Sequence, residues 1–318
     1  MSADFSAVGL AVGHATNEQG ITGLTVIRGV DGPLRGGVSV FGRATGTREL
    51  DALSPSAQAG RVDAILLSGG SAYGLDAAAG VMRWMEEHGR GFDVGVGVVP
   101  IVPAAVIFDL GIGDAKARPT ADMAYDACER ANTCDIMEGS VGAGTGATVG
   151  KGAGRANAMK GGFGCALRTS GDVVACAAAV VNALGDVRSA DGRIVAGARG
   201  PRGEFLDSAH HLMSRPASFG GATPQNTTLC VVATNASLDR SELLQLSRAA
   251  GAALFKRVTP AGTSYDGDIV FALCQPDGVR GALMAIEMLA TAALEDAIER
   301  GVRTAAGRGG IPGLADAK

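Results

Sequence analysis

The chain has 318 residues, a net charge of −4, a pI of about 5.6 and no long run of like charges. This charge pattern lacks the basic patch that nucleic-acid binding requires, which excludes that class of function. A chain of this length buries about three quarters of its unfolded surface, and with 47% hydrophobic but only 4% aromatic residues its core must consist mainly of Ala, Val, Leu and Ile.

The first half of the chain alternates short apolar runs, typical of strands, with glycine turns. The expected strands are Val8–Val12, Gly23–Arg28, Gly37–Phe41 and Ala64–Leu67. A helix is expected from Ser71, as its N-cap, through Glu87, because His88-Gly89 is a typical C-terminal signal. A further helix is expected at Thr120–Ala131.

The middle of the chain predicts a pair of strands and then a loop. Gly162–Val181 contains two β-like runs joined at Ser170-Gly171-Asp172. Residues 201–226 are polar, rich in Pro and Gly and without a clear period, so they are expected to form an exposed linker or flexible loop.

The last part of the chain predicts two strands and two helices. The strands are expected at Thr228–Ala233 and Ile269–Leu273, and the helices at Ser237–Arg257 and Val279–Arg303, with a break at Pro276-Asp277-Gly278. Strands and helices thus occur in blocks without regular alternation, which favours a layered α+β fold over a βαβ repeat. We expect a single domain covering residues 1–318.

Cysteine usage and hydropathy indicate the compartment. The six cysteines show no C-x-x-C spacing and are expected to be buried, reduced thiols; they are Cys128, Cys134, Cys165, Cys176, Cys230 and Cys274. The N-terminus lacks the basic and apolar regions of a secretory signal. The apolar stretch Val94–Phe108 is too short to span a membrane and contains two prolines. These features predict a soluble, cytoplasmic protein.

The glycine-rich segment 139–154 invites comparison with a phosphate-binding loop, but its spacing is wrong. Five residues separate Gly144 from Gly150, and Gly152 follows Lys151, where a P-loop requires a gap of four and a Ser or Thr after the lysine. Lys151 is one of only five lysines and the sole charge between Glu138 and Arg155. It is either an exposed loop residue or a cation that approaches an active site closely.

Asp266-Gly267-Asp268 precedes an apolar strand. Residues two apart in an extended segment point to the same side, so both carboxylates could serve one site, although Asp-Gly is also a common turn signal. Asn182 could donate its amide to an oxyanion or sit in a turn. Tyr73, near an expected helix start, could line a pocket with its hydroxyl or simply fill it.

Histidine spacing argues against a metal site. His14, His88, His210 and His211 show no metal-ligand pattern, so we expect neither a zinc site nor a histidine-based triad. We expect no metal and no organic cofactor.

The most informative segment surrounds Asn226-Thr227. Loop-like Gly220, Gly221 and Pro224 precede this pair, and a strand-forming run follows at once. Asn and Thr could simply turn the chain into a strand. Alternatively, a cut between them would give Thr227 its own general base, an α-amino group with a pKa of about 7.7–8.0, next to its hydroxyl nucleophile.

Five motifs in this order resemble the DmpA/BapA aminopeptidase family. They are Ser68-Gly-Gly-Ser-Ala-Tyr-Gly-Leu-Asp76, Gly142-Ala-Gly-Thr-Gly146 with Lys151, Val180-Val-Asn182, Asn226-Thr-Thr228 and Tyr265-Asp-Gly-Asp-Ile-Val-Phe271. The resemblance spans residues 8–290. It implies a four-layer αββα sandwich related to N-terminal nucleophile hydrolases, and a precursor that cuts itself into an α chain, 1–226, and a β chain, 227–318.

The resemblance also implies roles for individual residues. Thr227 corresponds to the nucleophile and Asn226 to the residue before the cut, while Asn182 and Tyr73 correspond to oxyanion donors. Lys151, Asp266 and Asp268 correspond to a supporting polar network.

The aminopeptidases of this family use a serine nucleophile, whereas this chain has Thr and two Asp, as in the nylon-oligomer hydrolase branch. An amidase acting on small peptides or linear amides, assembled as a homo-oligomer (a tetramer of processed pairs), is therefore expected. Two alternatives remain. One is an acyltransferase of the ornithine acetyltransferase type, and the other is a non-enzymatic scaffold with the same fold.

Overall fold

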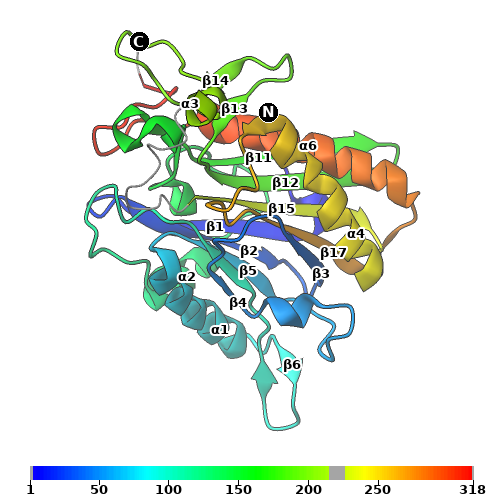
Figure 1. The fold of residues 1–318 in the computed structure, drawn as a ribbon. Helices are drawn as coiled ribbons and strands as arrows, with labels where there is room; N and C mark the ends of the chain where they lie inside the picture. Colours follow the sequence, from blue (N-terminus) through cyan, green and yellow to red (C-terminus); the bar gives the residue numbers. More distant parts are fainter. Residues whose placement is uncertain (1–2, 215–225, 317–318) are drawn as a thin grey trace.

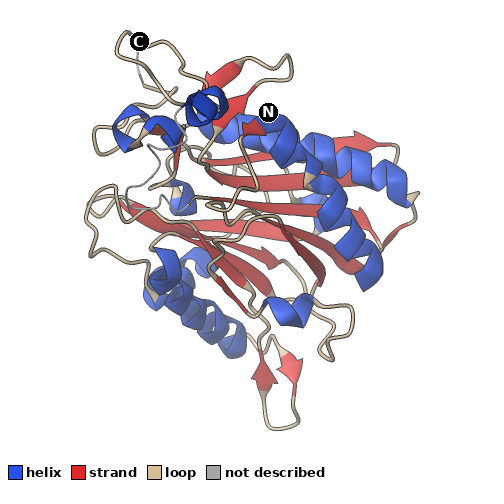
Figure 2. Cartoon of the chain, viewed as in Figure 1, coloured by secondary structure: helices blue, strands red, loops and turns tan. Residues whose placement is uncertain are grey.

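Two β-sheets face each other at the centre of the molecule, and helices cover their outer faces (Figure 1, Figure 2). The computed structural model describes residues 3–214 and 226–316. The order helix, sheet, sheet, helix confirms the expected α+β class and the four-layer αββα sandwich. Gly220, Gly221 and Pro224, expected to form a loop, lie outside the described residues.

The first sheet comes entirely from the first third of the chain. Its strands, in spatial order, are β1 (Leu10–Asn17), β2 (Thr22–Gly29), β5 (Ala64–Ser68), β8 (Ala104–Val106) and β4 (Thr47–Arg48). Only β5 and β8 pair in parallel. The outer face packs against α1 (Ala78–Glu87) and α2 (Ala121–Glu129) through a cluster that includes Val81 and Trp84.

The second sheet combines distant parts of the chain. Its strands, in spatial order, are β11 (Phe163–Ser170), β12 (Val173–Asn182), β15 (Thr227–Ala236), β17 (Ile269–Val279) and β3 (Arg35–Val40). The central pair, β15 and β17, is parallel and the other pairs are antiparallel. Helices α4 (Arg240–Ala250) and α6 (Leu283–Arg303) lie across its outer face, and α5 (Ala252–Arg257) packs against α6.

Shorter elements surround this frame. The remaining strands are β6 (Phe92–Asp93), β7 (Val98–Val99), β9 (Thr148–Val149), β10 (Met159–Lys160), β13 (Asp186–Arg188), β14 (Ile194–Ala196) and β16 (Val258–Thr259). The other helices are α3 (Ser208–Ser214) and the single-turn 3₁₀ segments η1 (Ser6–Val8), η2 (Leu50–Leu53), η4 (Gly142–Gly144), η5 (Lys151–Ala153) and η6 (Arg155–Asn157), with the longer 3₁₀ segment η3 (Ser71–Ala77).

Strand β12 shows how the sequence pattern produces these layers. Ala175, Ala177 and Ala179 pack toward α4 and α6, whereas the alternate residues Cys176 and Ala178 face the first sheet. This two-residue alternation is what a strand buried on both faces requires. The small side chains of β12 also let α6 pack close to the sheet. The expected core of Ala, Val, Leu and Ile is confirmed.

Most expected elements of the first half are confirmed, but the start of the first helix is wrong. The segment begins as 3₁₀ helix η3 and becomes α-helical only at Ala78. Ser71 is not the N-cap, because Gly70 holds that position in a left-handed conformation with φ 78° and no side chain caps the turn. The C-terminal signal at His88-Gly89 is confirmed, as is Thr120, whose hydroxyl accepts a hydrogen bond from the Met123 N–H.

The second half differs from expectation in three places. Within the presumed linker, residues 208–214 form helix α3. The expected long helix from Ser237 begins only after Asp239, which caps it with a capping box, and it is divided at Gly251 into α4 and α5. Strand β17 continues through the expected break at Pro276 to Val279, with a register shift that accommodates it, so the last helix, α6, begins at Leu283 and not at Val279.

All six cysteines are free thiols, and five are buried. The expectation of burial is wrong for Cys134, which is exposed. Across residues 3–214 and 226–316, none of the helices combines the length and the apolar character needed to cross a membrane.

Gly164 on β11 provides a test of how closely α6 approaches the sheet. A Cβ added there would lie 2.2 Å from the Ala297 oxygen and 2.3 Å from the Gly301 nitrogen, both backbone atoms of α6. Gly164→Ala should therefore lower the free energy of unfolding by about 1–3 kcal/mol, as overpacking typically does. Gly97→Ala is the matched control, because that position opens to empty space. Equal denaturant midpoints for the two variants would contradict the close packing.

Candidate active site

Thr227 is the first residue of β15, at the end of the central strand pair. Along this strand Leu229 and Val231 face the first sheet, so Thr227, which shares their parity, points to the same side. Its neighbour across the sheet is Asn182, the last residue of β12. Thr227 is 2% exposed. The hydroxyl therefore lies between the two sheets, at one end of the sandwich.

The peptide bond before Thr227 is held by backbone hydrogen bonds. Asn226 and Asp266 form a parallel bridge, in which the Asn226 N–H donates to the Tyr265 oxygen at 3.1 Å and the Gly267 N–H donates to the Asn226 oxygen at 2.7 Å. The Thr227 hydroxyl donates to the same Asn226 oxygen at 2.6 Å. The hydroxyl of Thr227 thus lies against the carbonyl of the residue that precedes it.

Lys151 is buried rather than exposed in a loop. It begins the 3₁₀ segment η5, after Gly150 with φ 72°, and is only 4% exposed. Its Nζ donates to the Asn182 side-chain oxygen at 2.8 Å and to the Asn182 backbone oxygen at 3.3 Å. Burial, and then the nearby charge of Arg155, lower the pKa of Lys151 to about 7.

Asp266 and Asp268 are both buried beside Thr227. Asp268 accepts hydrogen bonds from the Thr228 N–H at 2.6 Å and the Gly262 N–H at 3.0 Å. Burial, and then the charge of Asp266, raise the pKa of Asp268 to about 7. Both carboxylates also raise the pKa of Lys151, so the three side chains form one electrostatic cluster.

The Asp266-Gly267-Asp268 segment combines features of a turn and of two neighbouring carboxylates. Asp266 accepts from the N–H of Thr263 at 2.9 Å and from its hydroxyl at 2.7 Å, and its own N–H donates to the Thr263 oxygen at 3.2 Å. A turn is therefore present, but it precedes the Asp-Gly step. The two aspartates still lie close enough for one to shift the pKa of the other.

Asn182 belongs to the cluster, but its amide nitrogen points elsewhere. It ends strand β12 and is not a turn residue. Its side-chain oxygen accepts from Lys151 and from the Thr148 N–H at 3.1 Å. Its Nδ2 donates to the Phe108 oxygen at a long 3.4 Å. The structure therefore brings Asn182, Lys151, Thr227 and the two aspartates together.

Tyr73 is not brought into this group. Its side chain lies on η3 and is 65% exposed, with the Arg118 guanidinium 4.5 Å above the ring centroid. Its neighbours Ser71 and Ala72 line the pocket beside Thr227, whereas Tyr73 is not among the described residues that do so.

A pocket of about 320 Å³ opens beside Thr227. Its described lining residues come from both halves of the sandwich and none carries a charge: Ala44, Thr45, Gly46, Ser71, Ala72, Val106, Phe108 and Thr227. An uncharged wall next to a hydroxyl and a polar cluster is a suitable place for the neutral part of a small substrate. Sequence reasoning missed the 44–46 segment and Phe108, since neither carries a chemical signal.

Two further buried ionisable residues, Lys160 and Asp109, were also missed. Lys160 donates to the Thr145 oxygen at 2.7 Å and the Ala147 oxygen at 2.6 Å, and burial lowers its pKa to about 7. Asp109 accepts from the Thr22 hydroxyl and from the Gly70 N–H, both at 2.7 Å. The rarity of lysine that drew attention to Lys151 applies equally to Lys160 and could have identified it.

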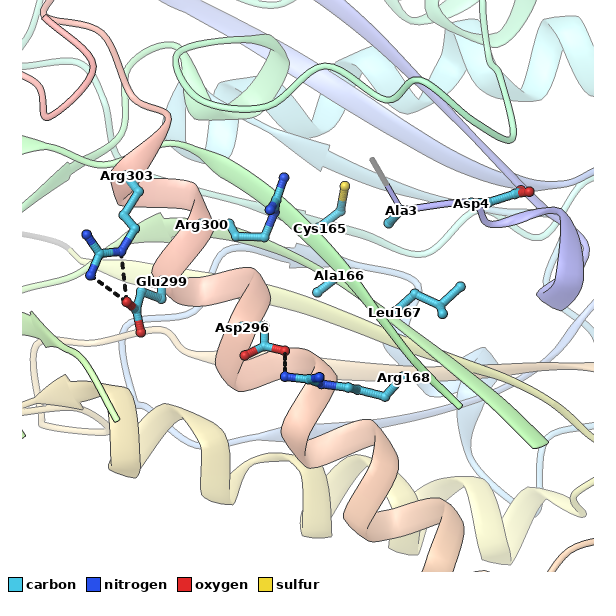
Figure 3. A pocket seen from close by; sticks show the side chains of 10 residues that line it. All are labelled: Ala3, Asp4, Cys165, Ala166, Leu167, Arg168, Asp296, Glu299, Arg300 and Arg303. Atoms are coloured by element: carbon cyan, nitrogen blue, oxygen red, sulfur yellow. Dashed lines mark hydrogen bonds and ion pairs between the residues drawn. The ribbon is translucent and has the colours of Figure 1, made fainter. Parts of the chain in front are cut away.

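A larger hollow of about 580 Å³ lies between α6 and β11 (Figure 3). Its charged side chains are largely paired with one another, as in Arg168–Asp296 and Arg303–Glu299. It contains none of the residues that the sequence singles out as candidates for catalysis, so the chemistry favours the smaller pocket. Within the described residues no three His, Cys, Asp or Glu side chains gather as metal ligands would.

Comparison with known proteins assigns the family. The sequence model of peptidase family S58 matches residues 6–309. The chain belongs to peptidase family S58. An uncharacterized aminopeptidase of Mycobacterium tuberculosis is 42% identical over 317 residues, covering 92% of this chain and 89% of that protein. A 6-aminohexanoate-oligomer endohydrolase of a Kocuria species is 30% identical, covering 85% of this chain and 74% of that protein.

Solved structures of low sequence identity show the same fold. A beta-aminopeptidase of a Burkholderia species superposes with a TM-score of 0.68 at 20% identity, covering 99% of this chain and 92% of that one. The L-aminopeptidase D-Ala-esterase/amidase of Ochrobactrum anthropi, described as a variant of the Ntn-hydrolase fold, gives 0.71 at 19%, covering 98% and 90%. These matches show that the chain shares the fold of these two enzymes, as expected from the sequence. Membership of family S58 confirms a hydrolase of peptide or amide bonds.

Buried Lys151 predicts a specific dependence of stability on pH. Its pKa is 10.5 in an unfolded chain and about 7 in the folded protein. At pH values between these two, the unfolded state binds a proton that the folded state lacks. The free energy of unfolding therefore rises as the pH rises, and it decreases as the pH falls toward 7. In Lys151→Met, the free energy of unfolding should rise less steeply with pH, and the difference in slope should correspond to about one bound proton.

The measurement is chemical denaturation at several pH values between about 7.5 and 9.5. Lys256→Met is the matched control, because Lys256 is an exposed lysine on α5. A Lys151→Met slope equal to that of the unaltered protein would show that Lys151 is charged in the folded state.

Proposed function

We propose that this chain is a self-processing amidase that uses Thr227 as an N-terminal nucleophile. The observation that carries the proposal is the 2.6 Å contact between the Thr227 hydroxyl and the Asn226 carbonyl oxygen, next to an uncharged pocket. A hydroxyl in contact with the carbonyl group it attacks satisfies the proximity requirement of an intramolecular reaction. The cut would yield an α chain of residues 1–226 and a β chain of residues 227–318.

Self-cleavage proceeds through an ester. Thr227 Oγ1 attacks the Asn226 carbonyl carbon, the bond from that carbon to the Thr227 nitrogen breaks, and the hydroxyl proton passes to the leaving nitrogen. Water then adds to the ester, releasing the Asn226 carboxylate and restoring the Thr227 hydroxyl. The product carries a free α-amino group at Thr227.

In turnover the same two groups act on a substrate amide. The Thr227 hydroxyl attacks the amide carbonyl while its α-amine accepts the proton, and the resulting acyl-enzyme is hydrolysed by water. Asp266 and Asp268 would favour the protonated form of that amine, and Lys151 would favour its neutral form only when Lys151 itself is protonated, below a pH of about 7. Asn182 would position Lys151, which donates to both of its oxygens. Tyr73, which follows the pocket residues Ser71 and Ala72 in the sequence, would donate its hydroxyl to the oxyanion formed on the substrate.

The substrate is a small peptide or a linear amide. The relatives of known description include an oligomer endohydrolase as well as aminopeptidases, and the Thr nucleophile with two aspartates agrees with the former. No metal or organic cofactor enters the proposed steps. We further propose that the processed pairs assemble into a cytoplasmic homo-oligomer. The acyltransferase alternative differs in its acceptor, and an assay with ornithine as the acceptor distinguishes the two.

Self-cleavage between Asn226 and Thr227 is the most direct prediction. Intact mass spectrometry of purified protein should find two associated fragments, the smaller one beginning at Thr227. Thr227→Ala should remain a single chain and lose amide hydrolysis, because the proposed nucleophile is absent. The neighbouring Thr228→Ala is the matched control and should still be cut. An uncut 318-residue chain after days at neutral pH would refute the proposal.

The charge cluster predicts non-additive kinetics. Asp266→Asn and Lys151→Met should each slow turnover by at least about tenfold, and the double variant should be little worse than the poorer single variant, because the groups act as a unit. Asp122→Asn and Lys256→Met, both at exposed positions, control for the loss of each charge. Strictly multiplicative losses in kcat/KM would show that Lys151 and Asp266 act independently.

A further inference from the structure

The carbonyl of Asn226 is held by a backbone donor as well as by the Thr227 hydroxyl. The Gly267 N–H donates to the Asn226 oxygen at 2.7 Å. This contact continues the parallel pairing of β15 and β17 by one bridge, between Asn226 and Asp266. The carbonyl therefore has a direction fixed by sheet geometry rather than by a mobile side chain.

Attack on this carbonyl moves negative charge onto its oxygen. As the bond from Thr227 Oγ1 to the Asn226 carbon forms, the carbonyl electron pair shifts to the oxygen that already accepts from Gly267. Donors at about 2.7–3.1 Å from the developing oxyanion, fixed before the reaction, are the arrangement that stabilises such a transition state. We propose that the backbone N–H of Gly267 is the oxyanion donor for self-cleavage. This inference rests on the proposed cut before Thr227.

The residues before and after Gly267 are both held by backbone hydrogen bonds. The Ala44 N–H donates to the Asp266 oxygen at 2.9 Å, and the Phe41 N–H donates to the Asp268 oxygen at 2.8 Å. Gly267 itself is buried. The donor is therefore preorganised, so little reorganisation accompanies charge development.

The close approach also explains why a glycine stands here. A Cβ on residue 267 would lie 2.5 Å from the Ala44 oxygen and 2.8 Å from Thr227 Oγ1. Any side chain would push against the nucleophile or against the loop that holds the segment. The position thus demands the absence of a side chain while using only the backbone N–H.

The side chains expected to supply oxyanion donors are engaged elsewhere. Asn182 Nδ2 donates to the Phe108 oxygen. Tyr73 lies largely exposed under Arg118. In self-cleavage, the geometry of the precursor therefore gives Gly267 the oxyanion role that the family resemblance implied for Asn182 and Tyr73.

A backbone substitution tests the donor without adding a side chain. Gly267→glycolate, introduced during translation with an α-hydroxy acid, replaces the N–H by an ester oxygen. The rate of self-cleavage, followed by intact mass spectrometry, should fall about 10²–10³-fold, the loss typical of removing one oxyanion donor. Gly95→glycolate is the matched control, because the Gly95 N–H donates to Asp93 in an exposed turn. A rate in the Gly267 variant equal to that of the control overturns the proposal.

Two further outcomes keep the inferences separate. If unaltered protein is not cut before Thr227, the proposed function itself fails. If the ester variant does not fold, as judged by circular dichroism, a crystal structure of uncut Thr227→Ala will show whether the Gly267 N–H contacts the Asn226 oxygen. A Gly267 nitrogen within about 3.2 Å of the Asn226 oxygen supports the proposal, and a distance beyond about 3.5 Å overturns it.

Discussion

The parallel pairing of β15 with β17 determines which groups meet around Thr227. Its register extends past the ends of both strands as the Asn226–Asp266 bridge, and the antiparallel pairing on the other side sets Asn182 opposite Thr227. A slip of one residue in either pairing would turn the Thr227 side chain away from the first sheet. The pocket, the carbonyl contact and the charge cluster would then separate. Sheet register is therefore the constraint from which the geometry of the site follows.

Burying charged groups in this place is costly unless each has partners. Lys151 and Lys160 are each held by two oxygens, and burial brings the pKa of each to about 7. Asp268 is held by two backbone N–H groups. Glycine lets the backbone beside Lys151 pack closely. A Cβ on Gly150 would lie 2.1 Å from backbone atoms of Gly197 and Ala198. The abundance of glycine in the sequence thus reflects, in part, how closely the backbone surrounds the site.

The sequence predicts this molecule best where one physical signal dominates. The two β-like runs of Gly162–Val181 correspond to β11 and β12 with the turn between them. The isolation of Lys151 drew attention to a lysine that the structure shows to be buried, although an exposed loop position was the other interpretation. Predictions failed where tertiary contacts decide. Strand pairing carries β17 past Pro276, and Gly70 rather than Ser71 is the N-cap of η3. Backbone donors such as the Gly267 N–H and neutral pocket walls leave no trace in residue chemistry, so only the folded structure identifies them.

The strand order of the second sheet has a consequence for the molecule after a cut at Thr227. Strands β15 and β17 would belong to one chain, while β12 and β3, which flank them, would belong to the other. The two products would share a single core without a covalent link. Unfolding would then change from a unimolecular to a bimolecular equilibrium, so the melting temperature would depend on protein concentration. Refolding would require two chains to find each other, and the mature protein would owe its persistence to a slow unfolding rate.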